Sequence, residues 1–347
     1  MSSIPVFDGH NDVLLRLWLK TEGDPVADFL QGHGLGHLDM PRMKKGGFAG
    51  GFFAIFAPAD SEDLPDDDDV NPPLAGTLEQ TKALQKTLEM AALLFRIERK
   101  SRGKFKVCRT VGEIRECLAK GVMAAIFHIE GAEATDANFK TLDVLYESGL
   151  RSLGPVWSRS NIFGHGVPFR FPSTGDTGDG LTEAGKSLIR YCNERRLLID
   201  LSHLNEKGFW DAAKLSTAPL VATHSNALAI CASSRNLSDD QLKAIRDSGG
   251  MVGLNFASGF LREDGRWRTD TPLDIMVRHL DHLIKVAGEN CVALGSDFDG
   301  ARIPAAIGDA TGLPNLIEAL RERQYGEKLI AKIAHENWLS VLERTWG

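Results

Sequence analysis

Histidine and carboxylate residues of the kind that bind metals recur along this chain, each one soon after an apolar segment. The first two form the pair His10-x-Asp12, which follows the apolar stretch 4–7. If residues 4–10 form a strand, residues two apart share one face, so both side chains can reach a single divalent cation. Taken alone, the pair is equally compatible with a metal site and with an ordinary turn. The later residues of this kind are Glu130, His203, His224, Asp297 and Asp299.

A strand-like apolar segment precedes each of these residues, and amphipathic, helix-like segments separate the strands. The eight strong strand candidates lie near Val6, Phe53, Ala125, Leu153, Ile199, Val221, Val252 and Ala293. Regular alternation of strands and helices predicts an α/β fold with a parallel sheet, and eight strands predict a closed (β/α)8 TIM barrel. The alternative is a doubly wound open sheet, which is disfavoured because no GxGxxG-type turn follows any strand. No linker interrupts the chain, so we expect one domain over residues 1–347.

A barrel would bring the carboxyl ends of its strands to one mouth, and the polar residues would converge there. Carboxylates gathered in a partly buried mouth repel one another and raise each other's pKa, and one or two divalent cations would relieve that repulsion. Mixed imidazole and carboxylate ligands suit zinc and similar metals. Each residue singly also fits a turn or a loop, so the metal prediction depends on the joint pattern.

The composition excludes several classes of protein. An apolar content of 43% and a charged content of 25% are ordinary for a soluble globular chain. A net charge of −7 argues against a general nucleic-acid-binding protein. No apolar run is long enough to span a bilayer, and the N-terminus lacks a signal-peptide pattern. Five scattered cysteines without a CxxC pair indicate reduced thiols, so we expect a cytoplasmic location.

Two residues near the predicted cluster, His128 and Asp299, are not expected to be metal ligands themselves. His128 alternates with Glu130 along its strand, so it either supports the metal cluster from behind or packs in the core. Asp299 is expected to be structural and to cap the loop after the eighth strand.

Taken together, these motifs make the chain resemble the membrane (renal) dipeptidase family, peptidase family M19 of the amidohydrolase superfamily. The resemblance covers residues 6–300, and its motifs occur in the family's order. They are DGHND at 8–12, IEG at 129–131, IDLSH at 199–203, THS at 223–225, SRN at 234–236 and GSDFDG at 295–300.

The resemblance implies a site that holds two zinc ions or other divalent metals. His10 and Asp12 would bind one metal, His203 and His224 the other, and Glu130 would bridge the two.

The resemblance also implies roles in the reaction. Asp297 would be the catalytic general base and acid, acting on a metal-bridging hydroxide that attacks the amide bond. Arg235 would bind the terminal carboxylate of the substrate, which suits the bidentate geometry of a guanidinium. The implied activity is hydrolysis of short dipeptides, L-Xaa-D-Xaa or L-Xaa-L-Xaa.

The chain departs from the family pattern at two places. Trp157 stands where the family commonly has a histidine that acts on the scissile carbonyl. We hypothesise that His165, eight residues later, reaches in to replace it; the alternative is an exposed loop histidine. The segment 255–257, Asn-Phe-Ala, lacks an aromatic residue often found after that phenylalanine, so the substrate pocket is expected to differ in shape. Trp157 is itself a candidate lining residue of that pocket.

Two other functions stay open at this point. One is hydrolysis of another small amide, an N-acyl amino acid or a lactone. The other is a metal-binding protein without catalysis. The expected partner is a small dipeptide, with no nucleic acid and no membrane involved. Many family members are dimers, so a homodimer is an expectation from the resemblance.

Overall fold

The computed structural model describes residues 4–59, 66–73 and 76–347. All its paired strands in the two sheets run parallel. The strands are β1 Val6–Asn11, β2 Phe48–Phe56, β3 Phe105–Val107, β4 Met123–Glu130, β5 Leu150–Gly154, β6 Leu198–Ile199, β7 Val221–Ala222, β8 Met251–Asn255 and β9 Val292–Gly295.

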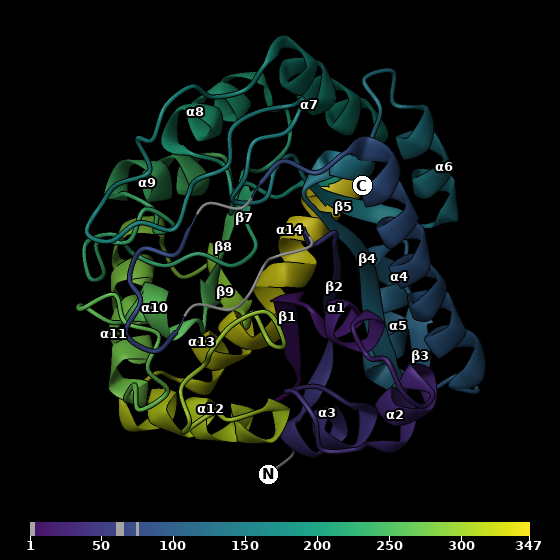
Figure 1. Ribbon diagram of the computed structural model, residues 1–347. Coiled ribbons are helices and arrows are strands. Elements are labelled where there is room, and N and C mark those ends of the chain that lie inside the picture. Colours follow the sequence, from purple (N-terminus) through teal and green to yellow (C-terminus); the bar gives the residue numbers. More distant parts are fainter. Residues whose placement is uncertain (1–3, 60–65, 74–75) are drawn as a thin grey trace.

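The strands form two sheets that close into one ring. The first sheet has the order β1-β2-β4-β5-β6, and the second has the order β7-β8-β9. A parallel bridge between Asp200 and Val221 joins β6 to β7, and a bridge between Asn11 and Phe298 joins β1 to the segment after β9. Eight strands therefore surround one axis, and Figure 1 shows the helices arranged around them. The prediction of a TIM-barrel-type fold is confirmed.

Strand β3 lies outside this ring. Its residues Phe105 and Val107 pair with Met123 and Ala125 in the first half of β4. Strand β5 pairs with the second half of β4, from Phe127 onward. One long strand thus has two successive neighbours on the same side, and the ring keeps its eight members.

Most of the helices fall where amphipathic segments predict them. They are α1 Val13–Trp18, α2 Pro25–Gln31, α3 Met40–Gly46, α4 Gln80–Lys100, α5 Val111–Lys120, α6 Lys140–Ser148, α7 Glu183–Arg195, α8 Glu206–Leu215, α9 Asp239–Asp247, α10 Ser258–Leu261, α11 Leu273–Ala287, α12 Leu313–Glu322, α13 Glu327–Ala331 and α14 Asn337–Trp346. Helix α9 begins with a capping box, in which the Ser238 and Gln241 side chains bond each other's backbone. Among the described residues, no helix is both long and apolar enough to cross a membrane.

The end of the barrel opposite the carboxyl ends of the strands is filled with apolar side chains. Phe7, Phe52, Ile126 and neighbouring strand residues pack there with Trp338 of α14. The indole Nε1 of Trp338 donates to the backbone oxygen of Leu294 at 2.9 Å. Figure 1 shows α14 within the outline of the ring rather than among the outer helices. This packed floor leaves the opposite mouth for polar chemistry.

Candidate metal centre and active site

His10 and Asp12 meet at the end of β1, as the sequence predicts. His10 lies in the strand, and Asp12 is the first residue beyond it. Both are buried, at 0% and 4% exposure, and His10 Nε2 lies 3.2 Å from Asp12 Oδ2. Their approach therefore comes from the turn into α1, which brings Asp12 back toward the axis, and not from strand alternation alone.

Glu130 occupies the centre of the cluster. It is the last residue of β4, whose flanking strands place it at the mouth. Its Oε1 lies 2.8 Å from His203 Nε2, 3.4 Å from His224 Nε2 and 3.6 Å from His10 Nε2. One carboxylate oxygen is thus surrounded by nitrogen atoms from β1 and from the segments that follow β6 and β7.

The two later histidines are held by their outer nitrogen atoms. His203 Nδ1 lies 2.8 Å from the hydroxyl of Ser158, and His224 Nδ1 lies 2.8 Å from the hydroxyl of Thr223. These contacts direct both Nε2 atoms inward, where they lie 3.0 Å apart. Orientation of an imidazole by a partner on its second nitrogen is the usual arrangement at protein metal sites.

The charges in the cluster are balanced poorly by protein groups alone. Burial raises the pKa of Glu130 well above its usual range, and burial lowers the pKa values of His203 and His224 well below theirs. Burial also opposes protonation of His10, but Glu130 and Asp12 outweigh it and raise the His10 pKa to about 10. Two neutral imidazoles and crowded carboxylates form a donor set that fits divalent cations, which would replace the His10 proton as the source of positive charge.

Asp297 joins this cluster from the loop after β9. Its backbone has φ 58°, in the left-handed region that non-glycine residues rarely adopt, and its amide donates to the His10 oxygen at 3.0 Å. Ligand atoms of His10, Asp12 and Asp297 all lie within 4.8 Å of one another. Asn255 Nδ2 donates to Asp297 Oδ2 at 2.9 Å, and burial raises the pKa of the Asp297 carboxyl.

Asp299, two residues later, has a different position. It accepts from the His37 amide at 2.5 Å and pairs with Arg16 at 3.0 Å, so it fastens the loop before α3 to the barrel.

Arg235 reaches the cluster from the loop before α9. Its guanidinium is buried, donates to the backbone oxygen atoms of Ser202 and His224, and has Nη2 3.3 Å from His203 Nε2. It also lies 5.3 Å from the ring centre of Phe260. Burial lowers the Arg235 pKa to about 10, so the group keeps its charge at neutral pH.

Trp157 lies at the mouth, and His165 does not join the cluster. The Trp157 ring centre is 5.9 Å from that of His203, 4.8 Å from Phe56 and 5.6 Å from Phe169. His165 Nδ1 instead bonds the Ser160 hydroxyl at 2.9 Å, in the loop after β5. The geometry therefore offers no support for the hypothesis that His165 takes the place of the family histidine.

Two residues near the cluster, Arg159 and Asp200, received no role from the sequence, whereas His128 received two alternative roles. Arg159 is buried, pairs with Glu133 at 2.9 Å and lies 5.4 Å from the Trp157 ring. Asp200 lies beneath the cluster, 3.7 Å from His128 Nε2. His128 itself bonds Ser152 at 2.9 Å, so it supports the site from below. The IDLSH motif contains Asp200, but no spacing rule predicts these contacts between strands.

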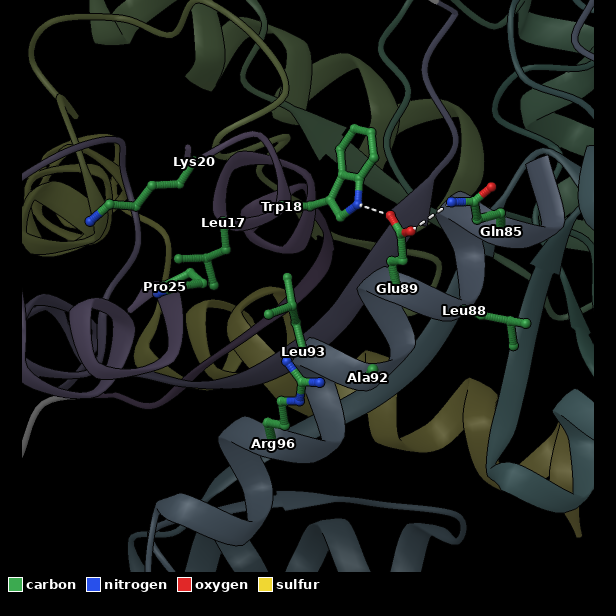
Figure 2. A pocket seen from close by; sticks show the side chains of 10 residues that line it. All are labelled: Leu17, Trp18, Lys20, Pro25, Gln85, Leu88, Glu89, Ala92, Leu93 and Arg96. Carbon is green, nitrogen blue, oxygen red and sulfur yellow. Dashed lines mark hydrogen bonds between the residues drawn. The ribbon is translucent and has the colours of Figure 1, made fainter. Parts of the chain in front are cut away.

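The surface cavity in Figure 2 is a separate feature. It has a volume of about 470 Å³ and lies between α1 and α4, where Trp18 donates to Glu89 at 2.7 Å. None of the clustered histidines and carboxylates lines it.

Known proteins match this chain closely. A metallo peptidase from Rhodobacter sphaeroides, solved with a phosphinate mimic of the dipeptide L-Ala-D-Ala, is 54% identical with a TM-score of 0.96, over 99% of this chain and 100% of that one. The dipeptidase AC, a metallo peptidase of family M19, is 55% identical with a TM-score of 0.94, over 100% of both chains. An "Uncharacterized protein in pqqA 5'region" of Klebsiella pneumoniae is 49% identical over 258 residues, covering 74% of this chain and 95% of that protein.

The sequence also matches the family model described as membrane dipeptidase (peptidase family M19) over residues 1–346. The match covers nearly the whole chain, including all residues of the cluster described above. The chain therefore belongs to the membrane dipeptidase family, peptidase family M19, whose members are hydrolases that act on peptide bonds.

Proposed function

We propose that the protein is a dipeptidase with two divalent metal ions, preferably zinc, in the mouth of the barrel. His10 and Asp12 would hold one ion, His203 and His224 the other, and Glu130 would bridge them. The observation that carries the proposal is the position of Glu130 Oε1, within 3.6 Å of the Nε2 atoms of all three histidines. A single oxygen so placed suits a carboxylate shared between two cations.

Asp297 is the group that would move protons. When bound, the cations would acidify a water molecule and polarise the peptide carbonyl. Asn255 holds Asp297 Oδ2, which leaves Oδ1 to accept the proton of the attacking water. The same carboxyl then delivers that proton to the nitrogen of the departing amine. Its raised pKa suits both steps, since the group must gain and lose a proton in one turnover.

Arg235 would fix the free carboxylate of the substrate. The guanidinium lies beside His203, so a carboxylate bound there would lie close to the candidate metal ligands. This limits the substrate to short peptides. Dipeptides of the L-Xaa-D-Xaa type are the first candidates, because the R. sphaeroides relative is solved with a mimic of L-Ala-D-Ala. L-Xaa-L-Xaa dipeptides are the second.

A panel of dipeptides, assayed together with metal analysis, tests the proposal. We expect about two zinc ions per chain and hydrolysis of free dipeptides, with little activity when the C-terminal carboxylate is amidated. Hydrolysis of N-acyl amino acids or lactones in preference to dipeptides would favour the other amidohydrolase activity. Metal binding without hydrolysis would favour a non-catalytic role.

The proposal also includes the cellular compartment and the partners of the protein. All five cysteines are free and buried thiols, which supports a reducing compartment such as the cytoplasm. The partner would be the small dipeptide substrate, without nucleic acid or membrane, and a homodimer remains a prediction from the family.

A further inference from the structure

The barrel has two seams at which neighbouring segments share a single bridge instead of a continuous ladder. The first seam lies between β6 and β7, and the second lies between β1 and the segment after β9. His203 lies four residues after β6, and His224 lies two residues after β7. Their separation therefore depends on contacts across a place where few backbone hydrogen bonds hold the sheet together.

A buried carboxylate spans the first seam. Asp200 is 3% exposed, and it accepts from the backbone amide of Thr223 at 2.9 Å and from the Thr223 hydroxyl at 2.6 Å. It also accepts from the amide and hydroxyl of Ser202, at 3.1 and 2.7 Å. Asp200 thus connects the segment that carries His203 to the segment that carries His224.

The same contacts determine which nitrogen of His224 carries the proton. The Thr223 hydroxyl has one proton, which it donates to Asp200 Oδ2. Its oxygen must therefore accept a hydrogen bond from His224 Nδ1, 2.8 Å away. A neutral His224 with its proton on Nδ1 presents the lone pair of Nε2 toward Glu130, which is the state that a metal ligand requires.

We propose that Asp200 is a positioning residue of the metal centre, acting through Thr223. Its carboxylate closes the seam beneath His203 and His224, and it fixes the ring tautomer of His224 in the form that can bind metal. The proposal rests on the proposed two-metal function for its consequence, but the tautomer is a property of the protein without metal.

The second seam supplies a matched control. Asp8 accepts from the amide of Ser296 at 2.6 Å and from its hydroxyl at 2.8 Å, which is the same pattern of two bonds across a seam. The Ser296 hydroxyl, however, next meets the backbone oxygen of His10 at 3.2 Å and not an imidazole nitrogen. A change at Asp8 should therefore disturb a seam to a similar degree without moving the His224 proton from Nδ1 to Nε2.

The experiment measures ¹⁵N chemical shifts of the histidine rings in metal-free protein. In Asp200→Asn, the side-chain amide donates to the Thr223 hydroxyl, which then donates to His224 Nδ1, so the His224 proton should move to Nε2. Thr223→Val removes the connection and should leave a mixture of tautomers. Thr223→Ser keeps the hydroxyl and Asp8→Asn acts at the other seam, so both should keep the wild-type tautomer.

Zinc affinity gives the second readout. We expect Asp200→Asn and Thr223→Val to weaken binding of one of the two ions by about 10- to 100-fold, the range found for partners of metal-binding histidines. Thr223→Ser should stay close to wild type.

A wild-type His224 tautomer together with wild-type zinc affinity in Thr223→Val would overturn the proposal. A His224 proton found on Nε2 in Asp8→Asn would also overturn it. If Asp200→Asn does not fold, Thr223→Val, which removes a single hydroxyl, decides the question. Failure of the wild-type protein to bind any divalent metal would reject the proposed function, whereas the ring shifts would still test the role of Asp200.

Discussion

Arg235 Nη2 lies 3.3 Å from His203 Nε2, so a permanent cation stands directly beside a neutral imidazole of the candidate metal centre. The arrangement is stable because the guanidinium also donates to two backbone oxygen atoms, those of Ser202 and His224. The group proposed to bind substrate and the groups proposed to bind metal therefore share one rigid framework.

Replacement of Arg235 by Lys tests the carboxylate-binding role. Lysine keeps the charge but loses the planar, two-pronged donor, so we expect KM for a dipeptide to rise by on the order of 100-fold, equivalent to about 3 kcal/mol. Metal content measured in the same samples should be unchanged, which serves as the control. A KM within a few fold of wild type would show that the substrate carboxylate binds elsewhere.

Replacement of Asp297 by Asn tests the proton-transfer role. The amide has the same shape but cannot accept the proton of water, so kcat should fall by roughly 10²- to 10⁴-fold. Zinc content should persist, because all five candidate ligands remain in place. Turnover close to wild type would reject Asp297 as the general base.

The metal-free protein should lose stability as pH rises through the alkaline range. His10 has a pKa of about 10 in the fold against an ordinary value of 6.5, so the folded state holds a proton that the unfolded state has released. The contribution of the His10 proton to the free energy of unfolding is complete below pH 6.5 and lost by about pH 10. Between these values the free energy of unfolding falls by up to about 1.4 kcal/mol per pH unit.

Thermal unfolding of metal-free protein at pH 7, 8 and 9 measures this slope, and His10→Gln should flatten it. Zinc should raise the melting temperature more at pH 8 than at pH 6, because the metal competes with the proton on His10. A melting temperature of the metal-free protein that climbs with pH would contradict the assignment.

Variants at Trp157 and His165 distinguish the roles of these two residues in the reaction. Trp157 packs against His203, Phe56 and Phe169, so Trp157→Ala should lower kcat/KM by about 10-fold, whereas Trp157→Phe should retain most of it. His165 contacts Ser160 instead, so His165→Ala should stay within about twofold. A large loss of kcat/KM in His165→Ala, with little loss in Trp157→Ala, would instead assign His165 a role in the reaction.

Local rules predicted the positions of the candidate ligands because each lies at or just beyond a strand or bridge of the ring. Apolar runs locate strands, parallel strands bring their carboxyl ends together, and the motif residues follow within a few positions. The same reasoning places Asp297 and Asp299 together after the eighth strand, and the structure shows that Asp299 fastens a loop instead of joining the cluster.

Other features depend on partners that are distant in sequence. Strands β6 and β7 have only two residues each, so their place in the ring depends on neighbouring strands and on a single bridge between Asp200 and Val221. The sequence pattern over 313–346 is typical of helix, but a turn before α13 and a π-helical segment, Lys332–Glu336, divide these residues into separate helices. The buried pair of Arg159 and Glu133 joins loops 26 residues apart, which no local pattern encodes.

The floor of the barrel has a consequence for the order of events during synthesis. Gly9 lies one residue before His10, and a Cβ there would overlap the ring of Trp338 in α14. The first strand to leave the ribosome thus completes its packing only after residues 337–346 have been made. A nascent chain that holds all the motif residues would still lack this support beneath His10. We therefore expect the candidate site to reach its final geometry only once α14 has packed against β1.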